Sequence, residues 1–137
     1  MNSVTPPRAN VLIVEDDAVI ALDLQMQLEQ QGYNVIAAVA NAADAVAAVG
    51  KARPDVAIVD VRIMGDVDGL SLAEELYVCE DVPVVLLTAY ADPAFVERAL
   101  AGGAYGYLTK PYEKGALLVT IALAVEKHRE LRRVRAR

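Results

Sequence analysis

Short aliphatic runs, separated by longer stretches rich in polar residues, recur along the whole chain. They predict buried strands over residues 10–14, 33–39, 56–59, 83–87 and 104–108. Continuous apolar runs of this length are typical of strands that are covered on both faces, as in a parallel sheet.

Between these runs the apolar residues follow a helical spacing. Ile20, Leu24 and Leu28 lie four apart and form one stripe, which predicts a helix over 17–31 that Gly32 ends. Further helices are predicted over 42–52, 69–79, 93–102 and 113–132. The side chains expected to cap helices are those of Asp17, Asn41 and Asp92.

Strands and helices therefore alternate five times without a linker or an internal repeat. This order predicts a single α/β domain with a doubly wound, five-stranded parallel sheet, because right-handed crossovers place helices on both faces. With 137 residues, 55% of them hydrophobic, the chain is long enough for a real core and too apolar for a disordered protein.

Composition and charge narrow the class of protein further. Cys79 is the only cysteine, which excludes a disulfide framework and a structural zinc site and predicts a small buried side chain. The chain has no apolar run of about 18 residues and no signal-peptide core, so we expect a cytoplasmic protein without membrane contact. The net charge is −6, but residues 126–137 carry +4 and the remainder −10, which argues against broad nucleic-acid binding.

The carboxyl ends of the predicted strands carry the residues that could do chemistry. In chain order these residues are Glu15, Asp16, Asp17, Asp60, Thr88 and Lys110. Because ligands of open parallel sheets bind beyond the carboxyl ends of the strands, we expect these side chains to surround one small site. A single acidic residue after a strand is more often a helix cap, and we expect Asp17 to be one. The joint presence of such residues at four strand ends nevertheless favours a functional site.

Clustered carboxylates repel one another unless a cation offsets their charge. Hard oxygen ligands suit Mg²⁺, whereas the lack of a histidine or cysteine cluster argues against softer metals. An aspartate in such a site can form an aspartyl-phosphate, whose charge Mg²⁺ and Lys110 would offset.

In order and spacing, these motifs resemble the receiver domain of two-component response regulators over about residues 9–125. The motifs are Val-Leu-Ile-Val-Glu15-Asp16-Asp17, Val-Ala-Ile-Val-Asp60, Asp68-Gly69, Val-Val-Leu-Leu-Thr88-Ala89 and Tyr107-Leu-Thr-Lys110-Pro111. The resemblance implies a flavodoxin-like sheet, as in the chemotaxis regulator, with strand order 2-1-3-4-5. Residues 1–8 are then an N-terminal tail, and residues 126–137 are a basic extension of the last helix.

The resemblance also implies a role for each motif residue. Asp60 would accept a phosphoryl group from a sensor histidine kinase or a phosphotransfer protein, Thr88 would hydrogen-bond that group and Lys110 would pair with it. Tyr107 would move inward as Thr88 shifts, and the switching surface would comprise the fourth helix, the fifth strand and the fifth helix. The Lys110–Pro111 bond is expected to be cis.

For Mg²⁺, the resemblance implies direct binding by Asp16, by Asp60 and by the backbone carbonyl of Arg62, with Glu15 acting through water. The loop from Asp60 to Gly69 departs from the common pattern, because it lacks a Met-Pro pair and is one residue longer. The side chain of Arg62 in this loop either reaches the phosphate or the acids, or is simply solvated.

Residues 117–125 of the last helix are apolar almost all round, although a helix on one face of a sheet needs only a stripe. The excess predicts a homodimer or a docked partner, promoted by phosphorylation, unless neighbouring elements shield it. His128 is expected on the surface. No output domain is expected after residue 132, so an unknown output protein, or a part missing from this chain, would carry the response.

Three functions are compatible with the pattern. The first is a single-domain receiver switch, stand-alone or at the N-terminus of a phosphorelay protein, that is not a turnover enzyme. The second is a phosphatase of the haloacid-dehalogenase type, although Arg62 stands where that class has a second acid. The third is a receiver-like binding module without phosphate turnover, which the intact acidic set disfavours.

Overall fold

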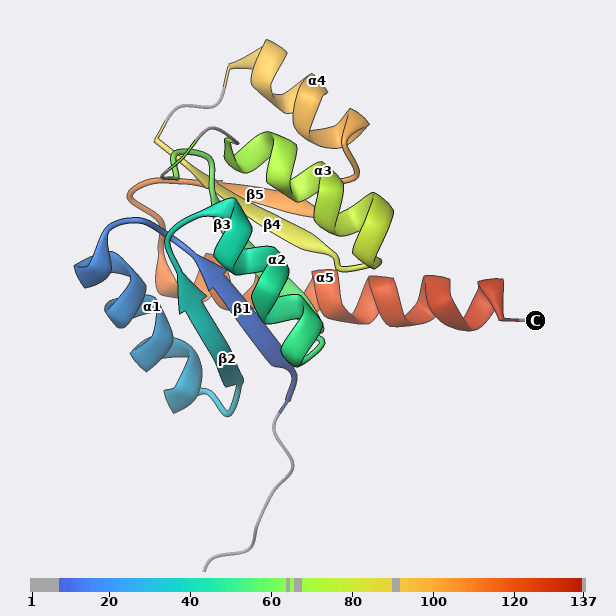
Figure 1. The fold of residues 1–137 in the computed structure, drawn as a ribbon, viewed down its shortest axis with the longest axis horizontal. Coiled ribbons are helices and arrows are strands. Elements are labelled where there is room, and N and C mark those ends of the chain that lie inside the picture. The colour runs from blue at the N-terminus through green and yellow to red at the C-terminus, as the bar shows by residue number, and fades with distance from the viewer. Residues whose placement is uncertain (1–7, 64, 66–67, 90–91, 137) are drawn as a thin grey trace, which may run out of the picture.

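The computed structural model describes residues 8–63, 65, 68–89 and 92–136. Its parallel five-stranded sheet has the strand order β2-β1-β3-β4-β5, which confirms the predicted fold class and strand order (Figure 1). The predicted N-terminal tail, residues 1–8, lies outside the described residues except for Arg8.

The elements follow the predicted alternation of strands and helices. The strands are β1 (Asn10–Val14), β2 (Asn34–Val39), β3 (Val56–Asp60), β4 (Val84–Thr88) and β5 (Gly106–Thr109). The helices are α1 (Ala18–Gln30), α2 (Ala42–Lys51), α3 (Gly69–Glu80), α4 (Pro93–Ala101) and α5 (Lys114–Arg135). None of the described helices is long and apolar enough to cross a membrane.

Polar side chains at the helix starts satisfy backbone N–H groups that have no partner inside the helix. Asp17 accepts hydrogen bonds from the first turn of α1, Asn41 from that of α2 and Asp92 from that of α4, which confirms the three predicted caps. Asp68 caps α3 in the same way, by accepting a hydrogen bond of 2.8 Å from the N–H of Ser71. The caps fix where each chain segment turns from a strand end into the following helix.

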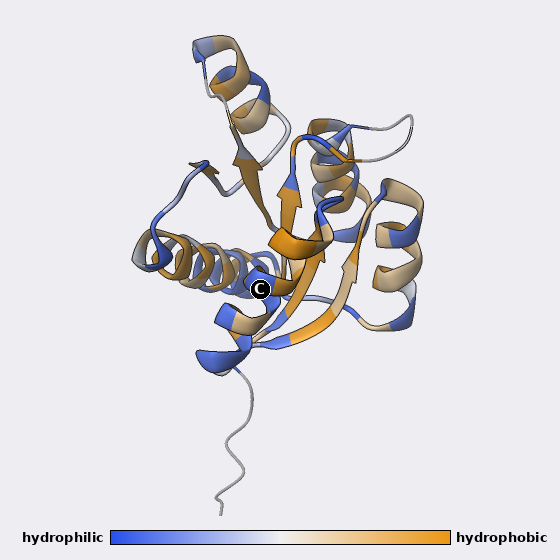
Figure 2. Ribbon diagram, turned by 90° about the vertical axis from the view of Figure 1, so that its left-hand side faces the viewer, coloured by the Kyte–Doolittle hydropathy of each residue, from blue (hydrophilic) through white to orange (hydrophobic). Residues whose placement is uncertain are grey.

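Helices cover both faces of the sheet, because successive strand residues point to opposite sides. In β1, Val11 and Ile13 join the core cluster that contains residues of α1 and α5, whereas Leu12 and Val14 join the cluster that contains residues of α2, α3 and α4. Figure 2 shows the strands as the hydrophobic centre between these layers. Burying each large aliphatic side chain of this core contributes roughly 1.5–3 kcal/mol.

Two single residues differ from the sequence-based expectation. Cys79 is exposed rather than buried, because it lies in the last turn of α3, where the buried stripe of that helix has ended. His128 is buried rather than on the surface, with 4% of its area exposed. Its ring is enclosed because it fits between Tyr105 and the backbone turn at Asp81.

Candidate functional site

The register of neighbouring strands places the candidate residues at one edge of the sheet. β1 and β3 pair Val14 with Val59, so that the next residues, Glu15 and Asp60, are neighbours. β4 and β5 end together, and Lys110 directly follows the end of β5. Four segments that are far apart in sequence therefore meet at the carboxyl ends of the strands, where the alternation of strands and helices predicts a site.

Asp60 is the last residue of β3, and only 5% of its area is exposed. The backbone N–H of Arg62 donates a hydrogen bond of 2.8 Å to Oδ1 of Asp60, while the ammonium group of Lys110 contacts Oδ2. The carboxylate is thus held at both oxygens. A fixed carboxylate that faces an open cavity has the form of a candidate nucleophile.

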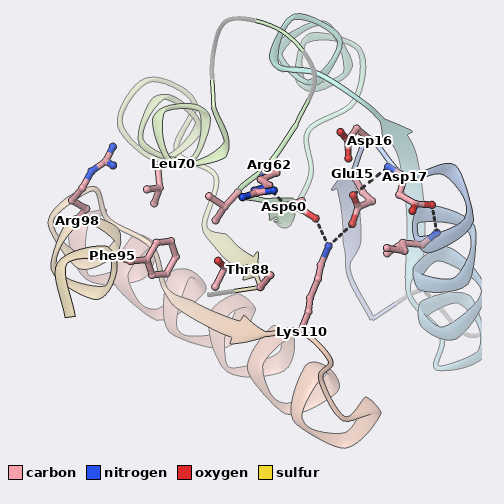
Figure 3. Close-up of a pocket in the computed structure, with 13 residues that line it drawn as sticks. Glu15, Asp16, Asp17, Asp60, Arg62, Leu70, Thr88, Phe95, Arg98 and Lys110 are labelled. Atoms are coloured by element: carbon pink, nitrogen blue, oxygen red, sulfur yellow. Dashed lines mark hydrogen bonds and ion pairs between the residues drawn. The ribbon is translucent and has the colours of Figure 1, made fainter. Parts of the chain in front are cut away.

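Lys110 joins the two buried acids. Its Nζ donates a hydrogen bond of 3.0 Å to Oε1 of Glu15 and also contacts Asp60 (Figure 3). Burial lowers the pKa of the Lys110 ammonium, but the hydrogen bonds to Asp60 and Glu15 outweigh this effect and raise the pKa above its ordinary value. Lys110 is therefore charged at neutral pH and offsets one of the two negative charges.

Glu15 is buried beside Asp60, and both the burial and this neighbour disfavour the charged form of its carboxyl group. Burial, together with the neighbouring Asp60, raises the pKa of Glu15 to about 7, although Lys110 acts in the opposite direction. Oε2 of Glu15 accepts a hydrogen bond of 3.2 Å from the N–H of Asp17. Asp16 and Asp17 are exposed, and Asp17 serves as the cap of α1, as expected.

A cavity of about 550 Å³ opens at this edge of the sheet. Its walls carry all of the predicted strand-end residues, together with residues of the loop after β3 and of α4 (Figure 3). The polar members of the lining are Glu15, Asp16, Asp17, Asp60, Arg62, Thr88, Arg98 and Lys110. The structure therefore brings the predicted site residues together, and their roles in phosphorylation remain predictions.

The donor set of this cavity fits Mg²⁺. In the described part of the chain, no three acidic, histidine or cysteine side chains are arranged to hold a metal by themselves. Mg²⁺ is usually bound through one or two carboxylates, with waters and phosphate oxygens completing its shell. Glu15 and Asp60 share a single ammonium group, and Asp16 adds a further carboxylate at the cavity wall, so negative charge is left for a cation to offset.

The start of α3 packs directly against the backbone of Asp60. A Cβ atom added to Gly69 would lie 2.1 Å from the carbonyl oxygen of Asp60 and 2.6 Å from Cα of Val61. Only glycine permits this close approach without a shift of the backbone. Gly69 therefore helps to fix the position of the candidate phosphoacceptor.

The residues predicted to switch lie on neighbouring strands. Thr88 is buried at the end of β4 and lines the cavity, and its carbonyl oxygen accepts a hydrogen bond of 2.7 Å from the N–H of Lys110. Tyr107 on β5 is 39% exposed, and its ring meets that of Phe95 edge to face, with 5.9 Å between the centroids. The Lys110–Pro111 bond is cis, as expected.

Some cavity residues were not predicted as site residues from the sequence, among them Leu70, Phe95 and Arg98. Phe95 and Arg98 could have been predicted, because they lie three residues apart on one face of a predicted helix. That helix follows the end of the fourth strand, so this face could be expected near the site. The side chain of Arg62 is exposed and lines the cavity, and its backbone donates to Asp60. The predicted metal contact through its carbonyl stays a prediction.

Comparisons with known proteins agree with this geometry. The family model described as "Response regulator receiver domain" matches residues 11–122. Transcriptional regulatory protein PdtaR of Mycobacterium tuberculosis is 38% identical over 121 residues, which cover 88% of this chain and 58% of that protein. Transcriptional regulatory protein CseB of Streptomyces avermitilis is 39% identical over 118 residues, which cover 86% of this chain and 49% of that protein. The chain thus spans about half the length of these curated relatives.

Solved structures show the same fold. The signal receiver domain of a modulated diguanylate cyclase from Desulfovibrio desulfuricans G20 superposes with a TM-score of 0.81 at 35% identity, covering 88% of this chain and 96% of that chain. Chemotaxis protein CheY4 of Vibrio cholerae superposes with a TM-score of 0.77 at 31% identity, covering 85% of this chain and 98% of that chain.

Proposed function

The chain belongs to the response regulator receiver domain family, and we propose that it is a signalling switch phosphorylated on Asp60. A sensor histidine kinase or a phosphotransfer protein would supply the phosphoryl group. The observation that carries the proposal is the contact of Lys110 with both Asp60 and Glu15 at the wall of an open cavity.

In the proposed step, a carboxylate oxygen of Asp60 forms a bond to phosphorus while the P–N bond of a phosphohistidine breaks. The imidazole leaves with the bonding electron pair and takes up a proton. Lys110 already touches the Asp60 carboxylate, so it can pair with the new phosphoryl oxygens without a large movement. The hydroxyl group of Thr88 would donate a hydrogen bond to the same group.

The residues that would hold Mg²⁺ are Asp16 and Asp60 with the backbone carbonyl of Arg62, and Glu15 through water. When bound, the metal would offset the negative charge of the approaching phosphoryl group. Burial, together with the neighbouring Asp60, already raises the pKa of Glu15, so a bound cation would favour its charged form. Cation binding and phosphorylation would therefore be coupled at one set of acids.

The response would spread from Thr88 to the surface formed by α4, β5 and α5. Tyr107 lies outside the cavity against Phe95 of α4, so an inward movement of its ring would remove that contact and reshape this surface. Phosphorylation would add strong hydrogen-bond acceptors and negative charge near Thr88 and Lys110. These groups would gain the new partners only in the phosphorylated state, which would shift the balance between the two positions of Tyr107. An unknown output protein would read the change.

We propose this switch as a stand-alone module or as the N-terminal part of a phosphorelay protein, working in the cytoplasm and not as a turnover enzyme. A phosphatase of the haloacid-dehalogenase type is the second candidate, because it too uses an aspartate at a strand end. The side chain two residues after Asp60 is Arg62, which cannot act as the second acid of that class. We therefore favour the switch.

The decisive experiment is incubation with acetyl phosphate and Mg²⁺, followed by measurement of the intact mass. We expect an adduct of about 80 Da, the mass of one phosphoryl group, that is absent in Asp60→Asn. Asp23→Asn is the matched control, because it removes an exposed carboxylate on α1, and it should keep the adduct. An adduct on Asp60→Asn, or no adduct on the natural chain, would refute the proposal, and steady hydrolysis of a generic phosphate ester would favour the phosphatase.

A further inference from the structure

α5 is 22 residues long, and its C-terminal half runs out past the sheet (Figure 1). One side of this half is fixed to the body of the domain. Asp81, in the turn after α3, lies 3.4 Å from Nε2 of His128, 3.6 Å from Nε of Arg132 and 3.2 Å from Nη2 of Arg135. The projecting helix is therefore held in one orientation.

The opposite side of α5 presents a mixed stripe, which we define as Leu123, Lys127, Glu130 and Val134. The spacing of four, three and four residues places all four side chains within a strip about 60° wide, at 3.6 residues per turn. Leu123 is 65% exposed and Val134 is 57% exposed. The apolar excess predicted for residues 117–125 is thus partly buried, at Leu117 and Ile121, and partly left on this outer face.

The charges of the stripe have no partners in the described part of the chain. Neither Lys127 nor Glu130 forms an ion pair with another described residue. Both lie between the two apolar side chains, one helical turn apart. The stripe therefore reads apolar, positive, negative, apolar along the helix.

When a second α5 runs in the opposite direction, its stripe sets apolar residues against apolar residues and each charge against the opposite charge. We therefore propose that a second copy of the chain docks on the stripe with its α5 antiparallel. A twofold axis between residues 128 and 129 would set each Leu123 against Val134 of the second copy, and each Lys127 against Glu130 of the second copy. A parallel pair in register would instead set lysine against lysine and glutamate against glutamate. Charge complementarity thus selects the antiparallel arrangement.

The antiparallel pair would also keep the two domains apart. The buried residues of α5 are Leu117, Ile121, Ala124, Val125 and His128, so each domain body lies on the side of its helix away from the stripe, and the reversed direction of the second helix would place the two bodies toward opposite ends of the pair. Only about three turns of each helix meet, which is less than a stable interface needs, so we expect a dissociation constant on the order of 100 μM. The proposal goes beyond the phosphorylation switch and does not depend on Asp60.

Sedimentation equilibrium on unphosphorylated protein, up to about 1 mM, tests the proposal through charge reversal. Lys127→Glu and Glu130→Lys should each weaken self-association about tenfold, because two attractive pairs become two repulsive ones. The double variant should restore it, and an equimolar mixture of the two single variants should form heterodimers. Asp60→Asn should associate like the natural chain, which separates this test from that of phosphorylation.

Cross-linking tests the direction of the pair. In a Cys79→Ser background, Leu123→Cys combined with Val134→Cys should give an intermolecular disulfide between positions 123 and 134 on mild oxidation. Links joining 123 to 123 would show a parallel pair and overturn the proposal. A monomer at every concentration, or single charge reversals that change nothing, would overturn it as well.

Discussion

Nζ of Lys110 lies 3.0 Å from Oε1 of Glu15, a residue 95 positions earlier in the chain. The same ammonium group contacts Asp60, so that one cation links the ends of β1, β3 and β5. Because Glu15 and Asp60 are both buried, this cation offsets part of the repulsion between the two carboxylates. We therefore expect Lys110 to matter both for stability and for the proposed reactivity.

Lys110→Met should slow phosphorylation of Asp60 by acetyl phosphate about 100-fold, the usual cost of losing one donor to a developing phosphoryl or oxyanion charge. Time-resolved intact mass spectrometry measures the rate. Lys51→Met, which removes an exposed lysine on α2, is the control and should react normally. Adduct formation in Lys110→Met at the natural rate would contradict the role that we assign to Lys110.

Gly69→Ala should lower the free energy of unfolding by about 3 kcal/mol, at the upper end of the cost of overpacking, because the new Cβ would meet backbone rather than a mobile side chain. It should also slow phosphorylation, since Asp60 must shift. Urea denaturation measures the first effect. Gly50→Ala is the matched control, because a Cβ there has nothing within 4 Å, and in a helix it should stabilise by up to about 1 kcal/mol. A Gly69→Ala protein as stable as the natural chain would show that α3 is not held against Asp60.

The contact between Tyr107 and Phe95 should report the switch. In the unphosphorylated protein, nuclear Overhauser effects should join the two rings, whose centroids are 5.9 Å apart. Adding beryllofluoride and Mg²⁺ should remove these effects as the ring of Tyr107 moves inward. Tyr107→Leu should still form the phosphoryl adduct and lose at most about 1.5 kcal/mol of stability, the value of one aromatic pair. Persistence of the ring contact in the beryllofluoride complex would argue against Tyr107 as the switch residue.

His128 should make the fold less stable in mild acid. Burial lowers its pKa, as do Arg135 and Arg132, while Asp81 acts in the opposite direction. Nε2 of His128 donates a hydrogen bond of 2.9 Å to the carbonyl oxygen of Asp81. Nδ1 of the neutral ring therefore accepts a hydrogen bond from the hydroxyl group of Tyr105. Burial, with the neighbouring Tyr77, raises the pKa of Tyr105 to about 12, so this donor stays protonated.

Because the folded pKa of His128 lies below its unfolded value, the unfolded chain binds a proton first as the pH falls. Its contribution to stability is therefore complete above about pH 6.5 and is lost as the pH drops toward the folded pKa, by at most about 1.4 kcal/mol per pH unit. His128→Gln keeps a donor and an acceptor but does not titrate. Urea denaturation from pH 5 to pH 7.5 should show that the natural chain loses stability relative to His128→Gln as the pH falls, because the raised pKa of Glu15 affects both proteins equally. A stability difference between the two proteins that stays constant over this range would refute the assignment.

Local patterns determined most of the architecture. Aliphatic runs located the strands, because a strand buried on both faces needs apolar residues at every position. Asp17, Asn41 and Asp92 marked helix starts, because a cap acts within its own turn. The strand-end residues could be assigned to one edge, because parallel strands bring their carboxyl ends together.

Only the tertiary structure decided which side chains meet. His128 is buried and Cys79 is exposed. The exposure of each side chain depends on which other element packs against it, and neither residue type nor spacing gives that information. The same holds for Phe95 and Arg98 at the cavity wall, and for the outer stripe of α5, whose exposure depends on where the sheet ends. Periodicity along a chain acts over a few residues, whereas the reach of Lys110 to Glu15 depends on how four strands align.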